Sequence, residues 1–384
     1  MGKNPNVVLV AYSEIGLKSE PVRRRLETML LSHIRYVLKR EGVAFQRIGR
    51  KRGRIYVTAQ EPERAAEQVA SKVFGVEYTA PALKTSTDFQ TLVQDAVEFA
   101  ESRLKGKRSF AVKARRAGEH PYTSRDLEVE IGAAILKRCG GTKKLKVNLK
   151  HPELTLHVEA REGDAYLYTE VHRGLGGLPF GSQGRVVAIL NGSPTFTAAA
   201  WLMMKRGVHI LPLVLAASSA DWENLQEKTR PVEALRPYIP LPIFKAYVAP
   251  LQNLHRLLGE NLKENLQEAL VQRTTVRIAC GLAAERGGMG VVLGLTLDSD
   301  PSDAVALLSL LTEVSDRPLF HPLIALERIE VEKICERLGL SFKPTRGGKG
   351  WADLDKGEVA RVEKELNLPD VAEEILRAVK TVEM

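Results

Sequence analysis

The sequence has few cysteines and no long apolar run, and both absences narrow the class of protein. Its 384 residues include three cysteines, Cys139, Cys280 and Cys335, which form neither a CxxC pair nor another metal-ligand pattern. This spacing argues against a disulfide framework and against a cysteine-built zinc site. No apolar run approaches the roughly 20 residues that a membrane helix needs, and the N-terminus lacks the layout of a secretory signal. We therefore predict a cytoplasmic protein with no membrane segment.

Histidine is also scarce. The eight histidines show no HxxxH or HExxH spacing, so we predict no metal site. Hydrophobic residues make up 44% and charged residues 27% of the chain, a composition typical of folded globular proteins and not of disordered ones. A chain of this length predicts two or three domains.

Positive charge is present in excess and is unevenly placed. The net charge is +9, and residues 1–173 hold 32 Lys and Arg against 21 Asp and Glu. Residues 174–384 hold 24 against 26, whereas residues 101–150 alone hold 14 against 5. A basic excess confined to one part of a chain indicates a nucleic-acid-binding module attached to a neutral one.

Strands and helices alternate in the first 173 residues. Residues 6–12, 54–59 and 78–85 are expected to be strands, and residues 19–42 and 61–75 amphipathic helices. A second module begins with a helix at 88–107 and a basic strand at 108–117. A helix at 121–141 with Ser124 as its N-cap follows, then strands with a hairpin across Gly163 and Asp164.

The pattern changes after a glycine-rich stretch at Gly174 to Gly184. Residues 185–190 and 208–216 are apolar except for Arg185 and His209, as expected for strands buried in a parallel sheet. Helices separate them and fill the C-terminal part, the last one predicted at 370–382. We therefore expect a doubly wound sheet with its ligand site at the carboxyl ends of the strands. The predicted domains are residues 1–80, 81–173 and 174–384.

Three stretches together resemble the tRNA 4-thiouridine synthase (tRNA sulfurtransferase) family. They are Tyr12 to Arg35, Phe110 to Leu136, and Gly176 to Leu190 with Ala198 to Gly207; Arg317 to Gly339 is a weaker echo. The resemblance covers almost the whole chain in the right order. It implies an α/β protein with an N-terminal ferredoxin-like domain, a THUMP RNA-binding domain and a doubly wound parallel-sheet PP-loop (adenine nucleotide alpha hydrolase-like) domain. It also implies tRNA as the partner, and ATP and magnesium as cofactors.

The chain departs from this family where catalysis takes place. Members carry Ser-Gly-Gly-x-Asp-Ser in the PP-loop, and the gap-free counterpart here is Asn191-Gly192-Ser193-Pro194-Thr195-Phe196. Thr195 stands at the position of the aspartate, and a neutral hydroxyl cannot replace a carboxylate as a ligand for a hard cation. Backbone N–H groups at a helix start could still hold a phosphate. The candidate phosphate-binding residues are Asn191, Gly192, Ser193 and Thr195.

Sulfur transfer needs a cysteine to carry a persulfide. The segment where the family places it, after Arg317 to Gly339, contains none. We expect Cys280 and Cys335 to be buried, inert thiols, and Cys139 belongs to the RNA-binding module. The family's Thr-Gly-Glu-Ser segment corresponds to Leu293-Gly294-Leu295-Thr296. No catalytic residue is identified.

Candidate phosphate contacts for RNA lie on the basic strand and on the Arg-rich first helix. They are Lys18, Arg23, Arg24, Lys113, Arg115, Arg116, Ser124 and Arg125. Asp298, Asp300 and Asp303 form an acidic group at the edge of the sheet, where a helix start is favoured over a metal site. Ser218, Ser219 and Asp221 lie at the same edge without a base that would make a nucleophile set.

Three functions stay open on the sequence alone. The favoured one is a tRNA-binding protein whose third domain has lost ATP-dependent sulfur transfer. The first alternative is an active tRNA sulfurtransferase or other tRNA-modifying enzyme with a rearranged site built from Thr195, Lys205 and the acidic group at Asp298. The second is a scaffold that presents tRNA to a separate modification enzyme. A homodimer partner is a further open possibility.

Overall fold

The computed structural model describes residues 3–51, 53–140, 145–218, 221, 228–259, 262–297, 301–342 and 350–384. The chain forms two compact units, Met1–Gly177 and Leu178–Met384, each with its own sheet. Within the described residues, no helix combines the length and the apolar character that crossing a bilayer requires.

The first half of unit Met1–Gly177 is a four-stranded antiparallel sheet in the order β2-β3-β1-β4, against which α1 and α2 pack. This order and the βαββαβ succession are those of a ferredoxin-like fold, as the resemblance implied. Its elements are β1 Val7–Ala11, η1 Glu14–Leu17, α1 Glu20–Arg40, β2 Phe45–Lys51, β3 Arg54–Ala59, α2 Pro62–Lys72 and β4 Tyr78–Thr85.

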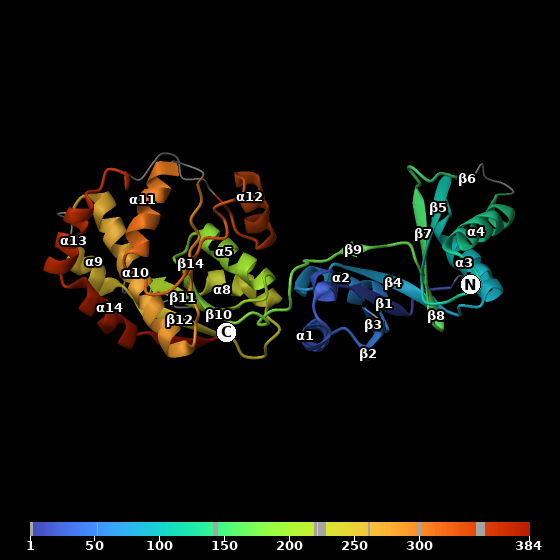
Figure 1. The fold of residues 1–384 in the computed structure, drawn as a ribbon, viewed down its shortest axis with the longest axis horizontal. Coiled ribbons are helices and arrows are strands. Elements are labelled where there is room, and N and C mark those ends of the chain that lie inside the picture. Colours follow the sequence, from blue (N-terminus) through green and yellow to red (C-terminus); the bar gives the residue numbers. More distant parts are fainter. Residues whose placement is uncertain are drawn as a thin grey trace. The chain divides into compact units, whose positions relative to one another are not determined.

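The second half of this unit continues the same sheet. β4 pairs with β8 through Leu83 to Thr85, and the order then runs β8-β7-β5-β6. β5 and β7 are parallel, and α3 and α4 cover one face of them (Figure 1). The elements are α3 Phe89–Arg103, β5 Ser109–Ala117, α4 Ser124–Cys139, β6 Lys146–Val147, β7 Leu154–Arg161, β8 Asp164–Tyr168 and β9 His172–Arg173.

Two local predictions in this half were wrong by one residue. The N-cap of α4 is Thr123 instead of Ser124: the Thr123 hydroxyl accepts the Asp126 N–H, and the Asp126 carboxylate accepts the Thr123 N–H. This reciprocal capping box needs a partner three residues on, which Asp126 provides for Thr123. The hairpin turn is Glu162-Gly163, because Arg161 pairs with Asp164.

Unit Leu178–Met384 contains a six-stranded sheet in the order β14-β13-β10-β11-β12-β15. All neighbours except β12 and β15 are parallel, which confirms the doubly wound sheet. The order reverses between β10 and β13, the position where such sheets bind ligands. The strands are β10 Arg185–Leu190, β11 His209–Ala216, β12 Lys245–Pro250, β13 Val291–Val292, β14 Leu319–Phe320 and β15 Lys380–Glu383.

Helices pack around this sheet. The described ones are α5 Pro194–Lys205, α8 Arg230–Leu235, η2 Arg236–Tyr238, α9 Gln252–Leu258, α10 Glu264–Arg286, α11 Pro301–Thr312, α12 Arg328–Arg337, α13 Lys356–Glu365 and α14 Leu368–Arg377.

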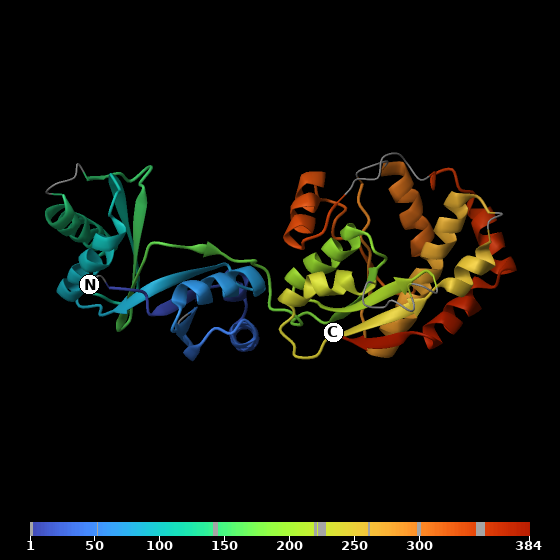
Figure 2. The same cartoon turned by 180° about the vertical axis from the view of Figure 1, so that it is seen from behind.

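The C-terminal end of the chain differs from the prediction. Helix α14 ends at Arg377, and Lys380–Glu383 form the antiparallel edge strand β15 instead of a further helical turn (red beside yellow β12 in Figure 2). The strand forms because Thr381 and Val382 pair with Tyr247 and Ala246 of β12, and β-branched residues favour a pleated backbone.

Candidate functional site

The turn between β10 and α5 is built as the PP-loop resemblance implied. Gly192 adopts φ 91°, a left-handed value that glycine tolerates without a Cβ penalty, and α5 begins at Pro194. The four candidate phosphate residues Asn191, Gly192, Ser193 and Thr195 therefore lie together at the carboxyl end of β10. This is the switch point of the sheet.

Two N–H donors of this turn form hydrogen bonds within the protein. The Asn191 side-chain carbonyl accepts the Ser193 N–H at 3.0 Å, and the Ser193 carbonyl accepts the Phe196 N–H at 3.2 Å. Pro194 has no N–H. Buried Thr195 has its hydroxyl 3.0 Å from that of Ser193. Ser193 and Phe196 thus already use their N–H groups, whereas a helix start ordinarily offers several such donors to an anion.

A loop from β13 also closes against the start of α5. A Cβ on Gly294 would lie 2.4 Å from both the nitrogen and Cα of Phe196 and 2.6 Å from the Thr195 carbonyl carbon. The residue is therefore a glycine because its backbone contacts the first turn of α5 directly. An anion that approached the Phe196 N–H would meet this backbone.

A small pocket lies beside the turn. Its volume is about 140 Å³, whereas sites for drug-sized ligands typically measure roughly 300–1,000 Å³. The hydroxyl of Thr275, one of the lining residues, already donates a hydrogen bond to the Val271 carbonyl at 2.8 Å. The pocket as it stands is too small for a whole nucleotide. It is lined by Ile189, Asn191, Phe196, Leu215, Glu268, Val271, Gln272, Thr275 and Leu293.

Asp303, the third aspartate of the acidic group predicted at the sheet edge, has its carboxylate engaged by the backbone and not open to a metal. The buried Asp303 carboxylate accepts the N–H groups of Gly350 and Ala352, both at 2.9 Å. Asp298 and Asp300 lie outside the described residues. In the described part of the chain, no three His, Cys, Asp or Glu side chains gather in a way that could hold a metal ion.

Two other candidates have structural roles or lie elsewhere. Asp221 accepts the N–H groups of Ala217 and Ser218 and pairs with Lys228 at 2.9 Å, and these contacts lower the pKa of its carboxyl, Lys228 most. Ser219 lies outside the described residues. Lys205 is the last residue of the 12-residue helix α5, about 16 Å along the helix axis from its start. Thr195 and Lys205 therefore lie at opposite ends of α5.

The thiols of unit Leu178–Met384 are buried, as predicted. Cys335 is fully buried, and burial raises the pKa of its thiol to about 11. Burial also raises the pKa of Cys280, whose sulfur lies 3.3 Å from the Ser315 hydroxyl. Since the thiolate is the reactive form, neither thiol is suited to carry sulfur. Cys139 is half-buried at the end of α4 in the other unit.

The basic strand β5 presents its cations on two faces. Phe110 and Val112 point into the core beneath α3 and α4, so Lys113 and Arg115 share the opposite, helix-free face of the sheet. Both side chains are exposed. Arg116 faces the other way and holds the loop before α4, donating to the carbonyls of His120 at 3.0 Å and Tyr122 at 2.8 Å.

The remaining RNA candidates are scattered over several surfaces. Exposed Arg125 lies in the first turn of α4, beside half-buried Ser124. Exposed Lys18 follows η1. Arg24 pairs with Glu20 on the same helix, and Arg23 lies 4.0 Å from the carboxylate of Glu27. The Glu27 carboxylate also accepts hydrogen bonds from Tyr12 and Arg50.

Sequence reasoning missed the residues beside Lys113 and Arg115. On β7, the His157 ring stacks on Tyr168 with centroids 4.9 Å apart and an interplanar angle of 7°. Lys113 lies opposite His157, and Arg115 opposite buried Glu159. The alternation of side chains along each strand could have indicated which residues share a face. The sequence of neither strand, however, determines the register in which β5 pairs with β7.

Comparisons with known proteins agree with this architecture. Three protein-family models match the chain: a ThiI ferredoxin-like domain at residues 7–80, a THUMP domain at 86–170, and the thiamine biosynthesis protein (ThiI) at 181–343. A probable tRNA sulfurtransferase of Methanosarcina acetivorans is 33% identical, over 99% of this chain and 94% of its own length.

Two solved structures share the fold. The crystal structure of PH1313 from Pyrococcus horikoshii is 28% identical with a TM-score of 0.67, and the match covers 87% of this chain and all of that one. A 4-thiouridine synthetase solved with RNA and ATP is 23% identical with a TM-score of 0.80, covering 99% of this chain and all of its own. The chain belongs to the tRNA sulfurtransferase family.

Proposed function

We propose that this chain binds tRNA through unit Met1–Gly177 and has lost the ATP-dependent sulfur transfer for which its family is named. Family membership supports tRNA as the partner, and the excess of basic residues in this unit supports electrostatic binding. The main support for the loss of sulfur transfer comes from the turn at Asn191 to Phe196, where N–H groups that could bind a phosphate are hydrogen-bonded within the protein. The N–H groups of Ser193 and Phe196 bond to the protein, and no carboxylate stands where the family has one.

The thiols support the same conclusion independently. A persulfide carrier must be accessible and must ionise near neutral pH. Cys280 and Cys335 satisfy neither requirement, and Cys139 lies in the other unit. The nucleotide turn and the sulfur carrier therefore depart from the family together.

For RNA, the face that bears Lys113 and Arg115 is the best-founded contact surface. Both cations are exposed on a helix-free sheet face, beside the stacked His157 and Tyr168 rings. Arg116 is left out, because its guanidinium holds the loop before α4. Recognition through phosphates and shape fits RNA stems, whose narrow major groove side chains cannot read.

The RNA-binding part of the proposal predicts that a substitution on this face lowers the affinity for different tRNAs by a similar factor. Changing Lys113 and Arg115 together to Gln should weaken binding of two unrelated tRNA transcripts about equally, because phosphate contacts carry no sequence information. Filter-binding titrations at several salt concentrations measure this. The matched control is Lys333→Gln with Lys364→Gln, two exposed lysines of the other unit. Unchanged affinity for both transcripts would remove this face from the interface.

The chemical half predicts that ATP with magnesium gives no binding heat at micromolar protein. The reason is the missing carboxylate, together with the occupied N–H groups of Ser193 and Phe196. Calorimetry measures the binding, and mass spectrometry of tRNA incubated with ATP and a persulfide donor measures thiolation. A micromolar Kd accompanied by thiolated uridine would restore the alternative of an active enzyme with a rearranged site.

A further inference from the structure

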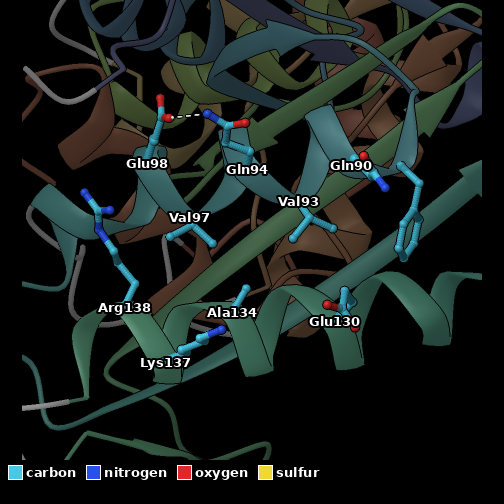
Figure 3. Close-up of a pocket in the computed structure, with 10 residues that line it drawn as sticks. Gln90, Val93, Gln94, Val97, Glu98, Glu130, Ala134, Lys137 and Arg138 are labelled. Atoms are coloured by element: carbon cyan, nitrogen blue, oxygen red, sulfur yellow. Dashed lines mark hydrogen bonds between the residues drawn. The ribbon is translucent and has the colours of Figure 1, made fainter.

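A second group of cations lies in the THUMP region, away from Lys113 and Arg115. The segment after α3, the last turn of α4 and the start of β6 meet there, around a pocket of about 230 Å³. Figure 3 shows Lys137 and Arg138 at one end of the groove between α3 and α4. We call this group the helix-end cluster; it consists of Lys105, Lys107, Arg108, Lys137, Arg138 and Lys146, all exposed.

The backbone holds these side chains on one edge of the sheet. The Lys146 N–H donates to the Arg108 carbonyl at 3.1 Å, and β6 pairs with the start of β5 at Ser109. Glu101 and Leu104 of the α3 end, Arg138 of α4 and Leu145 before β6 line the same pocket. The cluster therefore lies at the amino-terminal edge of β5.

Carboxylates near the cluster balance only part of its charge. Arg138 lies 3.4 Å from Glu101, and the Glu153 carboxylate accepts the Arg108 N–H at 3.3 Å. Among the described residues, the other five cations have no carboxylate within ion-pair distance of their side chains. The carboxyl ends of α3 and α4 add about half a negative charge each. Six cations against these opposing charges leave a surplus of about three.

This surplus exceeds what helix stability requires. One or two cations in the last turn complement a helix dipole, and Lys137 and Arg138 already do so for α4. Lys105, Lys107, Arg108 and Lys146 lie outside the helices, where their like charges repel one another and no described carboxylate pairs with their side chains. A partner with closely spaced negative charges accounts for them.

We propose that the helix-end cluster binds a second stretch of the phosphate backbone of the same RNA that contacts Lys113 and Arg115, an inference that rests on the proposed function. Arg115 is six residues beyond Ser109 on β5, so the two surfaces are separated by at least about 20 Å, the distance along the strand. At roughly 3 Å of axis per base pair, a stem needs at least about seven pairs to reach both. The RNA footprint on this unit is therefore bipartite.

The test uses the full chain and an in vitro transcribed tRNA. Lys105→Gln with Lys107→Gln removes two cations that support no helix. Each lost phosphate contact should reduce the slope of log K against log salt by about 0.7 to 0.9. The pair should therefore weaken binding about 15- to 30-fold at 150 mM salt, with an unchanged thermal melt. The control pair is again Lys333→Gln with Lys364→Gln.

A hairpin RNA of four base pairs distinguishes RNA that contacts both surfaces at once from RNA that binds at only one of them. It is too short to reach both surfaces, so the Lys105 and Lys107 variant should bind it within about twofold of wild type. If the wild-type chain binds no RNA, the proposed function fails. If it binds tRNA and the variant keeps the same affinity and salt slope, or weakens both RNAs equally, the bipartite footprint is wrong while RNA binding stands.

Discussion

His209 is a side chain whose charge state the fold constrains strongly. Its ring lies between Phe180 and Phe244, with centroids 5.1 and 6.1 Å away. Burial, and secondarily Arg185, lowers its pKa to about 4. An unfolded chain has the ordinary value near 6.5. Because the unfolded state takes up the proton first, stability is retained above pH 6.5 and falls as the pH drops from 6.5 toward 4.

Replacing His209 with Gln should therefore make stability less sensitive to acid. Wild type should lose more of its free energy of unfolding between pH 7 and pH 5 than His209→Gln does. Urea unfolding followed by circular dichroism at the two pH values measures both losses. His33, whose pKa burial also lowers to about 4, is present in both proteins and cancels. Equal losses would show that the His209 ring is not constrained to its neutral form.

At the scale of single residues, the sequence supplies candidates but not their partners. An aspartate after a buried strand reads equally as a metal ligand or as a cap. The role of Asp303 is decided by its hydrogen bonds to backbone N–H groups 47 and 49 positions further along the chain. No local sequence pattern shows such distant partners. Arg116 and Lys113 likewise look equivalent in the sequence. The pleat of β5 separates them, and only the tertiary fold shows which face the helices cover.

Helix α4 allows a prediction at the scale of an element. Since Thr123 is the N-cap and Ser124 the first helical residue, Thr123→Ala should lower the free energy of unfolding by about 1 kcal/mol. Ser124→Ala should change it by less than about 0.5 kcal/mol. Chemical unfolding of the two variants side by side gives the comparison. A larger cost at Ser124 would place the cap where the sequence first indicated it.

Elements were predictable where hydrophobic periodicity is strong. The apolar strands β10 and β11 and the amphipathic helix α1 follow from their own residues. β2 was not predicted, because this edge strand has no fully buried residue and so lacks the alternation that signals a strand. Helix α10 was not identified either: it is buried on several sides, and its apolar residues do not concentrate on one face.

At the scale of the whole molecule, the change in charge along the chain coincides with a change in architecture. The basic residues gather in unit Met1–Gly177, and the parallel sheet belongs to Leu178–Met384. Residues after 173 still bond to the first unit: the Gly174 N–H donates to Glu77, and Gly176 exchanges hydrogen bonds with Gly75 and Val76. The predicted boundary at residues 173 and 174 remains a proposal, and these bonds favour a cut after Gly177.

The fragment Met1–Gly177 should fold alone and retain tRNA binding. It contains a complete nine-stranded sheet and its own core, together with both cationic surfaces. We expect a cooperative thermal melt, an affinity for tRNA within about threefold of the full chain, and the same salt slope, because every proposed phosphate contact is present. The fragment Leu178–Met384 should bind no tRNA under the same conditions. A folded Met1–Gly177 that binds far more weakly, with a shallower slope, would show that the parallel-sheet unit contributes phosphate contacts of its own.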